Sequence, residues 1–442
     1  MDVHSTAAPS FRPIQYLGNK IRLLDDIAGA VASVVSPGAP VADLFSGTSV
    51  VGRRLSLRNP VIAVDVQAYT EVIGRAMLLT RRDDLDRFEI AEFLSRADEA
   101  ESSLRRTFAP LIQEEEHALE ALRNGDPLPM VRIIENGSPL SIAAGSTAVT
   151  NLPSGVRRLL AATPGPSDPT ATLAFGGVYF SYAQSIQLDA LYHAAAGEPR
   201  ALHDVLVASM LGVASEIVNT VGKQFAQPIR LLDRHGGEKP ILVERTVRDR
   251  TLNVRNLFVT FYERWRLLLP KELRSCRVAR QEVDEFLRDE SVWEAAYADP
   301  PYTIDHYSRF YHVLETLVRR DRPVLARMRK GGIPTIMRGL YREDRFQSDF
   351  CVPSRAPDAF RRLFEGVAAR GAPLVLSYSG HTDTPSQRPR LLPIGELVAI
   401  ARRNFSSIEV TEPQFEGHRK LNSHRRNVGM ERGSERLLIC RS

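Results

Sequence analysis

A short motif in the last third of the chain combines groups that can activate an amine. The motif is Asp299-Pro300-Pro301-Tyr302, and it follows an apolar run over 292–298 that is typical of a buried strand. Consecutive prolines end a strand, so a carboxylate, backbone carbonyls and an aromatic face are presented at one sheet edge. An exocyclic amine on a flat base is a poor nucleophile, because its lone pair is delocalised into the ring. A carboxylate and a carbonyl that accept its N–H bonds localise that lone pair, which suits methyl transfer; the alternative is a proline-rich turn after a core strand.

A second motif, near the start of the chain, has the pattern of a cofactor-binding turn. The run over 41–55 reads as an apolar strand with Asp43, a turn containing Phe45, Ser46 and Gly47, and a helix. A second strand follows and ends at Asp65, where an acid can accept both hydroxyls of a ribose. This pattern indicates a nucleoside-bearing cofactor, and the lack of G-x-G-x-x-G weighs against a nicotinamide. Alternatively, Asp65 caps the next helix.

Two further stretches carry candidate cofactor residues. The segment FRPIQYLGNK, residues 11–20, places Tyr16 and Lys20 before a predicted helix. They offer a stacking face and a cation, or they are an ordinary turn with a surface lysine. The run over 276–279 resembles a third strand, and Asp284 follows it closely enough to reach the adenine amine of a cofactor. The alternative for Asp284 is an acid at a helix N-terminus.

The α/β rhythm stops after residue 80 and resumes at about residue 271. The intervening sequence predicts helices over 86–123, 184–196 and 200–221. It predicts loops over 124–170, with a β-hairpin around 131–142. An insertion of this size in a sheet domain is usually functional. Taken singly, each of six polar or aromatic residues in the insertion is better explained by a structural role, because aromatic rings at helix starts mostly belong to the core. As a group they suit nucleic acid, with cations for phosphates, aromatic rings for bases and an amide for an adenine edge. They are Tyr179, Phe180, Tyr182, Lys223, Gln224 and Arg230.

The C-terminal part predicts strands over 334–338, 373–379, 408–410 and 435–440. Between the last two strands lies GHRKLNSHRRNVGMERG, a basic loop without an apolar face. It is either a clamp for phosphates or a solvated surface loop. Its candidate DNA-binding residues are Arg419, Lys420, Arg425 and Arg426.

Length and composition agree with a water-soluble protein of two or three domains, or of one domain with a large insertion. The chain has 442 residues, 43% of them hydrophobic and 25% charged, and a net charge of +5 that permits a polyanionic partner. Its three cysteines lie far apart without metal-ligand spacing, which argues for reduced thiols in the cytoplasm and against a zinc site. The longest apolar stretch, residues 205–221, contains Glu216 and Asn219 and is interpreted as a buried helix, so no membrane association is expected.

The order of these motifs resembles the alpha-group N6-adenine DNA methyltransferases, the Dam-like D12 class. QYLGNK, DLFSGT, an acid after strand two, a long insertion and DPPY occur in that family's order, and GGVYFSYAQSIQLDAL, YSRFYHVLETLVRRDRP and LVLSYSG are also similar to it. The resemblance implies a doubly wound α/β fold with a seven-stranded sheet that binds S-adenosyl-L-methionine. It also implies a catalytic domain over 11–80 and 271–442, with a helical target-recognition region over 81–270.

The same resemblance assigns roles by position. Tyr16, Lys20, Asp43, Phe45, Ser46, Gly47, Asp65, Asp284 and Asp299 match cofactor-binding positions, and Asp299, Pro300, Pro301 and Tyr302 match the catalytic motif. One position departs from the family pattern Phe-x-Gly-x-Gly, because Ser49 replaces its second glycine. A serine costs little there if its backbone keeps a negative φ.

Together these features predict a methyltransferase that modifies N6 of an adenine flipped out of a specific double-stranded DNA site. The motif also suits RNA adenine or cytosine N4, and a catalytically inactive DNA-binding homologue is a further alternative. Whether a restriction or defence-system protein is a partner stays open. No metal is expected to take part.

Overall fold

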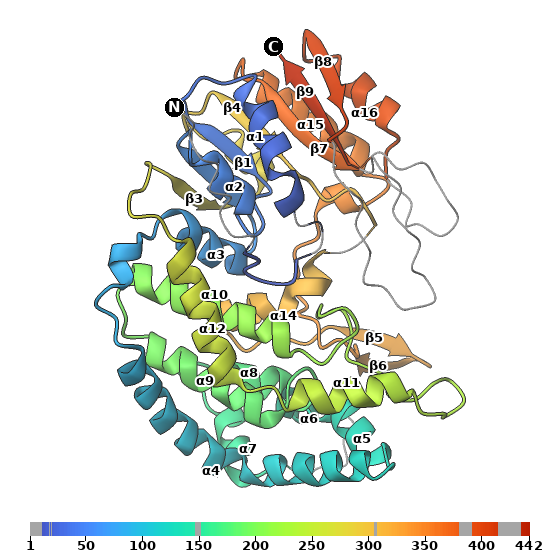
Figure 1. The fold of residues 1–442 in the computed structure, drawn as a ribbon. Helices are drawn as coiled ribbons and strands as arrows, with labels where there is room; N and C mark the ends of the chain where they lie inside the picture. Colours follow the sequence, from blue (N-terminus) through green and yellow to red (C-terminus); the bar gives the residue numbers. More distant parts are fainter. Residues whose placement is uncertain are drawn as a thin grey trace.

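The computed structural model describes residues 11–16, 18, 20–145, 152–304, 307–379, 391–413 and 435–442. A β-sheet with its flanking helices forms one half of the molecule, and a helical assembly forms the other (Figure 1). Within these ranges, no helix combines the length and the apolar character needed to cross a bilayer. The apolar stretch noted above forms a buried helix, as predicted.

The main sheet has seven strands in the order β3-β2-β1-β4-β7-β9-β8. The first five in this order are mutually parallel, whereas β9 is antiparallel to both of its neighbours. The order reverses between β1 and β4, the kind of position where α/β sheets bind ligands. The predicted α/β class with a seven-stranded sheet is confirmed. The strands span Val41–Leu44 (β1), Val61–Asp65 (β2), Arg277–Arg280 (β3), Ala295–Ala298 (β4), Leu374–Ser379 (β7), Ser407–Thr411 (β8) and Glu435–Arg441 (β9).

Helices cover both faces of this sheet, because the central strands alternate apolar side chains between two cores. Val41 and Tyr297 face one core, which also holds residues of α1, α2 and α3, while Ala42 and Ala298 face the other, with residues of α13, α15 and α16. All four residues of β1 are therefore buried. These helices span Leu24–Ala32 (α1), Val50–Leu55 (α2), Ala68–Leu78 (α3), Val283–Phe286 (α13), Ala356–Ala368 (α15) and Ile394–Ala401 (α16).

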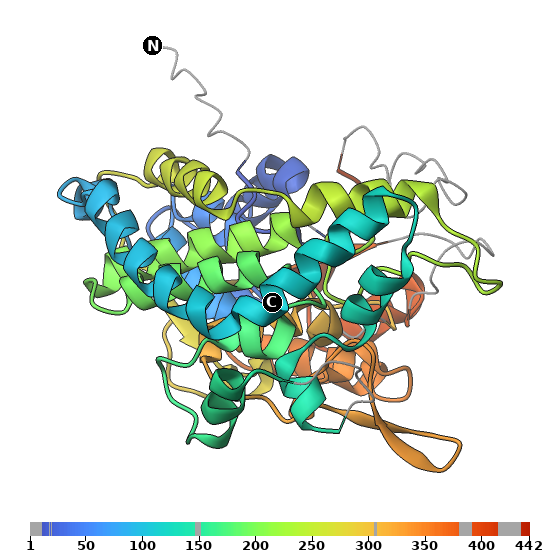
Figure 2. The same cartoon turned by 90° about the horizontal axis from the view of Figure 1, so that it is seen from below.

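The insertion is helical and lies on the side of the molecule that faces the viewer in Figure 2. Its local signals are clear at α9, where Ser181 and Gln184 form a reciprocal capping box. The hairpin predicted near 131–142 was wrong, because this stretch forms two helices, α5 and α6. The helices span Ile90–Arg123 (α4), Leu128–Asn136 (α5), Pro139–Ala143 (α6), Ser154–Ala161 (α7), Thr170–Phe175 (α8), Tyr182–Ala195 (α9), Arg200–Ile217 (α10), Pro240–Arg250 (α11) and Val254–Leu268 (α12).

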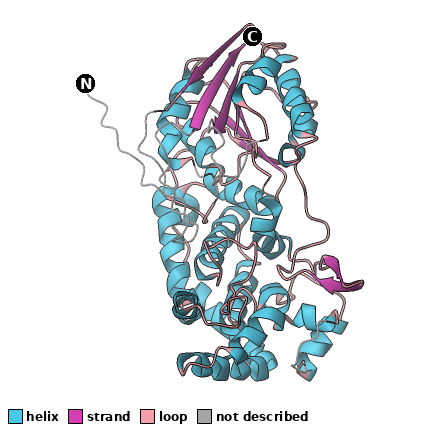
Figure 3. Cartoon of the chain, turned by 90° about the vertical axis from the view of Figure 1, so that its right-hand side faces the viewer, coloured by secondary structure: helices cyan, strands magenta, loops and turns pink. Residues whose placement is uncertain are grey.

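The segment between β4 and β7, which follows the DPPY motif, packs against the insertion. It contains α14 (Tyr307–Arg319) and a hairpin of β5 (Arg327–Lys330) and β6 (Ile333–Ile336), which stands apart from the main sheet (Figure 3). Arg338 contacts Glu135 of α5 through two N–O pairs of 2.7 Å, and Arg320 contacts Asp189 of α9 at 2.8 Å. The strand predicted over 334–338 therefore belongs to this hairpin, and its placement in the main sheet was wrong.

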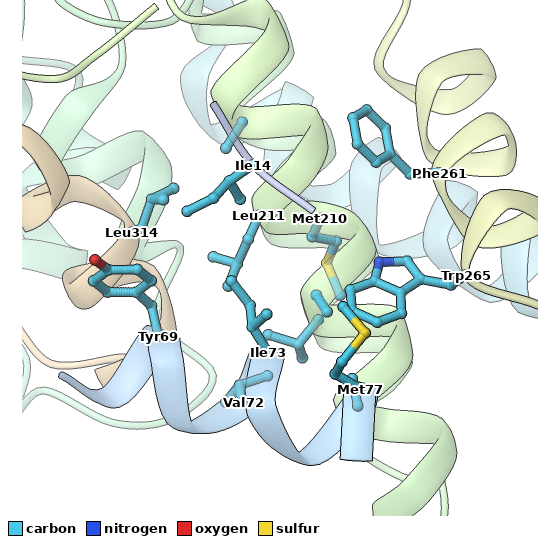
Figure 4. Close-up of a cluster of buried hydrophobic side chains, with 14 of the residues drawn as sticks. Ile14, Tyr69, Val72, Ile73, Met77, Met210, Leu211, Phe261, Trp265 and Leu314 are labelled. Carbon is cyan, nitrogen blue, oxygen red and sulfur yellow. The ribbon is translucent and has the colours of Figure 1, made fainter. Parts of the chain in front are cut away.

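The insertion and the sheet domain share a hydrophobic core. Figure 4 shows α3, with Ile73 and Met77, packed against Leu211 of α10 and Trp265 of α12. Because this contact is apolar and extensive, the insertion is fixed against one face of the sheet domain. The domain boundaries at residues 80 and 271 stay a prediction.

Candidate active site

A cavity of about 290 Å³ lies at the carboxyl edge of the sheet, where β1 and β4 meet. Leu44 pairs with Val64 on one side and with Ala298 on the other, so all three strands end in register. The next residues, Phe45, Asp65 and Asp299, consequently reach the same edge. The structure brings every predicted cofactor residue to the cavity wall: Tyr16, Lys20, Asp43, Phe45, Ser46, Gly47, Asp65, Asp284 and Asp299.

The turn after β1 is held in an unusual backbone conformation. Phe45, Gly47 and Ser49 all have positive φ angles, of 61°, 52° and 55°. Hydrogen bonds from Ser46 N to Val64 O (2.9 Å) and from Ser49 N to Ser46 O (2.8 Å) fix the turn. The condition under which a serine costs little at this position is therefore not met, and Ser49 adopts the left-handed conformation that favours glycine.

Asp65 stabilises this turn from the end of β2. Its carboxylate accepts hydrogen bonds from the backbone N–H groups of Gly47 and Gln67, both at 3.0 Å. Burial raises the pKa of Asp65, although these hydrogen bonds oppose the rise. The carboxylate thus orders the cofactor turn and the start of α3, and it also lines the cavity.

Asp43 is a buried acid at the floor of the cavity. It is 1% exposed, and its Oδ2 has no hydrogen-bond partner among the residues that the structure describes. Burial raises the pKa of Asp43 to about 8. Gly52 of α2 lies so close that a Cβ there would stand 2.9 Å from this oxygen. A ligand that carries positive charge would lower the pKa of Asp43 and favour its ionised form.

The N-terminal segment closes the cavity from the other side. Tyr16 stacks on Tyr311 of α14 with ring centroids 4.9 Å apart. Its hydroxyl would lie 3.0 Å from a Cβ at Gly47, so only a glycine fits beneath the ring. The Lys20 ammonium lies 3.0 Å from the Asp299 carboxylate and is almost completely buried.

Two carboxylates compete for the Lys20 ammonium. The second is Glu435, the first residue of β9, at 3.7 Å. Burial lowers the pKa of Lys20, but the carboxylates of Asp299 and Glu435 outweigh burial and raise this pKa above its ordinary value. Burial raises the pKa of Asp299 to about 6, although Lys20 opposes the rise. Around Lys20, two acids therefore share one cation.

Tyr302 and Pro301 line the cavity beside Asp299, and Pro300 is buried behind them. The Tyr302 hydroxyl donates to Glu435 Oε1 at 3.0 Å, and its ring contacts Tyr378 at 5.3 Å between centroids. The Lys20 ammonium lies 5.8 Å from the centroid of the same ring. The aromatic face of the motif is thus positioned by β7, by β9 and by the N-terminal segment.

Sequence reasoning missed part of the cavity wall. The segment over 346–351 lines it, and Phe350 meets Phe45 edge to face at 5.1 Å. Asp284 also lines the cavity, but its carboxylate contacts Arg362 of α15 at 2.6 Å. Neither Glu435 nor this segment lies within a sequence motif. A search for polar residues directly after strands would also miss Glu435, because this residue begins its strand.

The candidate DNA-binding residues have different environments. Lys223 contacts Asp249 at 3.0 Å and donates to the carbonyls of Glu216 and Val218, so its ammonium caps α10. Burial lowers the pKa of Lys223, and the neighbouring Asp249 carboxylate opposes that shift. Arg230 is exposed. Arg419, Lys420, Arg425 and Arg426 lie outside the described residues. The aromatic group was interpreted wrongly, because Tyr179, Phe180 and Tyr182 are buried in the hydrophobic cores.

Comparison with known proteins gives one informative match. The chain is 33% identical over 131 residues to "Modification methylase LlaI" of Lactococcus lactis subsp. lactis. The aligned stretch covers 30% of this chain and 18% of that protein. No family model matches the chain. The similarity is therefore to part of a protein named as a modification methylase, and the chain spans less than a fifth of that protein's length.

Proposed function

We propose that this chain is an S-adenosyl-L-methionine-dependent DNA methyltransferase that modifies N6 of a flipped-out adenine in a specific duplex site. The observation that carries the proposal is the meeting of the DPPY motif with the strand–turn–helix motif at one cavity. The similarity to a modification methylase supports the reaction class, and the order of motifs supports adenine as the target.

The cavity residues fit the proposed cofactor. Asp43 offers a buried, unpartnered carboxylate oxygen for its positive charge, and the glycine at position 47 keeps the turn open to a close ligand. Asp65 would hold the ribose, and Asp284 would lie near the adenine. When bound, the cofactor supplies a methyl group on a sulfonium centre.

The residues of the DPPY motif would then prepare the amine. Tyr302, held at its hydroxyl and at its ring, stacks on the target base. The Asp299 carboxylate and the Pro300 carbonyl accept the two N–H bonds, which localises the lone pair on nitrogen. Lys20 keeps Asp299 ionised and oriented at 3.0 Å. Catalysis thus rests on positioning and on fixed charges.

DNA would approach the open side of the cavity, and the target base would leave the stack to enter it. Exposed Arg230 and the basic loop with Arg419, Lys420, Arg425 and Arg426 remain the proposed phosphate contacts. Lys223 is also a proposed phosphate contact, although its ammonium already caps α10 and would have to leave the carbonyls there to reach a phosphate. A cognate restriction or defence-system protein is a proposed partner.

The decisive experiment is modified-base sequencing of genomic DNA from cells that express the wild type or Asp299→Ala. We expect N6-methyladenine at one recurrent sequence with the wild type and none with the variant. Circular dichroism of both proteins checks that the variant is folded, and calorimetry measures whether each protein binds S-adenosyl-L-methionine. Methylation of cytosine would contradict the adenine assignment, and methylation of RNA alone in a parallel assay would contradict the DNA assignment. Cofactor binding without any methylation would favour an inactive DNA-binding homologue.

A further inference from the structure

We propose that Glu435 is a positioning residue for the transfer, acting on Tyr302 through a hydrogen bond and on Asp299 through its charge. This inference rests on the proposed function and deepens it. Glu435 is absent from the DPPY motif and from the cavity wall, yet it accepts a hydrogen bond from Tyr302 and lies 3.7 Å from the Lys20 ammonium that pairs with Asp299. It comes from β9, the antiparallel strand next to β7.

The first effect is mechanical. The Tyr302 ring is tilted by 59° against Tyr378 and is held at its far end by Glu435 Oε1 at 3.0 Å. A tyrosine fixed at both ends presents one orientation of its face, whereas a phenylalanine would be restrained by ring packing alone. Since stacking on the target base depends on that orientation, the hydrogen bond preorganises the site.

The second effect is electrostatic. Glu435 shares Lys20 with Asp299, at 3.7 Å and 3.0 Å, and both acids have mostly buried side chains. Burial raises the pKa of Asp299, and the negative charge of Glu435 adds to the rise. Other charged or titratable groups that face Asp299 are Lys20, Asp43 of β1, Tyr16, Tyr297 of β4 and Tyr307 of α14.

The sign of the pH effect follows from this arrangement. Asp299 must be ionised to accept an N–H bond, so activity should fall as the pH falls through its pKa of about 6. This fall is the acidic limb of the pH–activity profile. Removal of the Glu435 charge lowers the pKa of Asp299 and should move the acidic limb to lower pH. A residue that only supported the fold would not move the limb.

Three variants separate the two effects. Glu435→Gln keeps an oxygen that accepts from Tyr302 but removes the charge, so we expect a near-normal plateau rate and an acidic limb at lower pH. Tyr302→Phe keeps the charge, so we expect an unmoved limb and a kcat lower on the order of tenfold, because misplaced reacting groups are costly. Glu435→Ala should show both changes, and its loss of kcat should not add to that of Tyr302→Phe in the double variant.

Glu409→Gln is the matched control. Glu409 lies on the neighbouring strand β8 and pairs with Arg441 at 3.1 Å on the surface, so its loss should leave rate and pH profile unchanged. The measurement is kcat and kcat/KM from pH 5 to 9 for an unmethylated duplex that contains the sequence modified by the wild type. Circular dichroism of each variant checks its folding. An unmoved acidic limb in Glu435→Gln, or fully additive losses in the double variant, would overturn the inference while leaving the proposed function intact. No methylation by the wild type would overturn both.

Discussion

Ser49 occupies a position where the backbone is strained. Its φ of 55° lies in the left-handed region, and its buried hydroxyl has no hydrogen-bond partner among the described residues. A side chain in this conformation costs about 1–2 kcal/mol relative to glycine. The strain persists because Asp65 and the hydrogen bond to Ser46 fix the turn.

Replacement of Ser49 by glycine should therefore stabilise the protein. We expect Ser49→Gly to raise the free energy of unfolding by about 1 kcal/mol, after the greater flexibility of glycine in the unfolded chain is subtracted. Urea unfolding followed by circular dichroism measures the change. Ser49→Ala is the control, since it removes the hydroxyl but keeps the strain. Equal stabilisation by both substitutions would assign the cost to the hydroxyl.

Single residues of the site were predictable to the extent that they follow strands. The family resemblance assigned Phe45, Asp65 and Asp299 to one site, and the parallel pairing of β1 with β2 and β4 brings them to one sheet edge. The roles assigned to them stay predictions. Glu435 was not predictable, because it lies 133 residues from Tyr302 and its contact depends on how an antiparallel strand is inserted.

At the scale of elements, the packing of α10 depends on one small residue. A Cβ at Gly212 would lie 2.5 Å from the Phe261 ring of α12 and 2.8 Å from the backbone oxygen of Pro13. The glycine thus lets α10, α12 and the N-terminal segment approach closely. Figure 4 shows Phe261 beside α10 at this junction.

Gly212→Ala should destabilise the protein although alanine favours helices. Overpacking costs about 1–3 kcal/mol, and the gain in helix propensity offsets about 1 kcal/mol of it. We therefore expect a net loss of stability in thermal unfolding. Gly29→Ala in α1 is the matched control, because nothing lies within 4 Å of its added Cβ; it should be neutral or stabilising. A gain of stability in Gly212→Ala would show that α12 moves freely.

Elements were predicted best where a local pattern determines them. The central strands of the sheet and the mostly buried helices α9 and α10 are rich in apolar residues, and their predicted positions were nearly correct. The stretch over 131–142 failed, because its Asn-Gly pair is typical of a hairpin turn while its packing against α4 and α8 favours helices. The hairpin β5–β6 was misplaced, since strand periodicity does not say which sheet a strand joins.

At the scale of the whole molecule, the two tryptophans lie in different cores. Trp265 belongs to the core shared by the insertion and one face of the sheet, and Trp293 belongs to the core on the opposite face. Because the sheet lies between them and the insertion packs directly on α3, we expect the molecule to unfold as one unit.

Single-tryptophan variants test this expectation. Trp293→Phe leaves the emission of Trp265, and Trp265→Phe leaves that of Trp293. In each variant, the midpoint of urea unfolding by fluorescence should coincide with the midpoint by circular dichroism. If the fluorescence of Trp265 changed at a lower urea concentration than the secondary structure of the same variant, the insertion would unfold independently.

The position of β9 between β7 and β8 also bears on how the protein is made. A nascent chain that has been synthesised through β8 lacks the strand to which both neighbours pair, so the edge of β7 stays open and β8 has no place in the sheet. Lys20 and Tyr302 meet Glu435 only after residues 435–441 have left the ribosome. Competence for the reaction is therefore expected to appear in one step, once β9 has been translated and has joined the sheet, instead of growing as the chain lengthens.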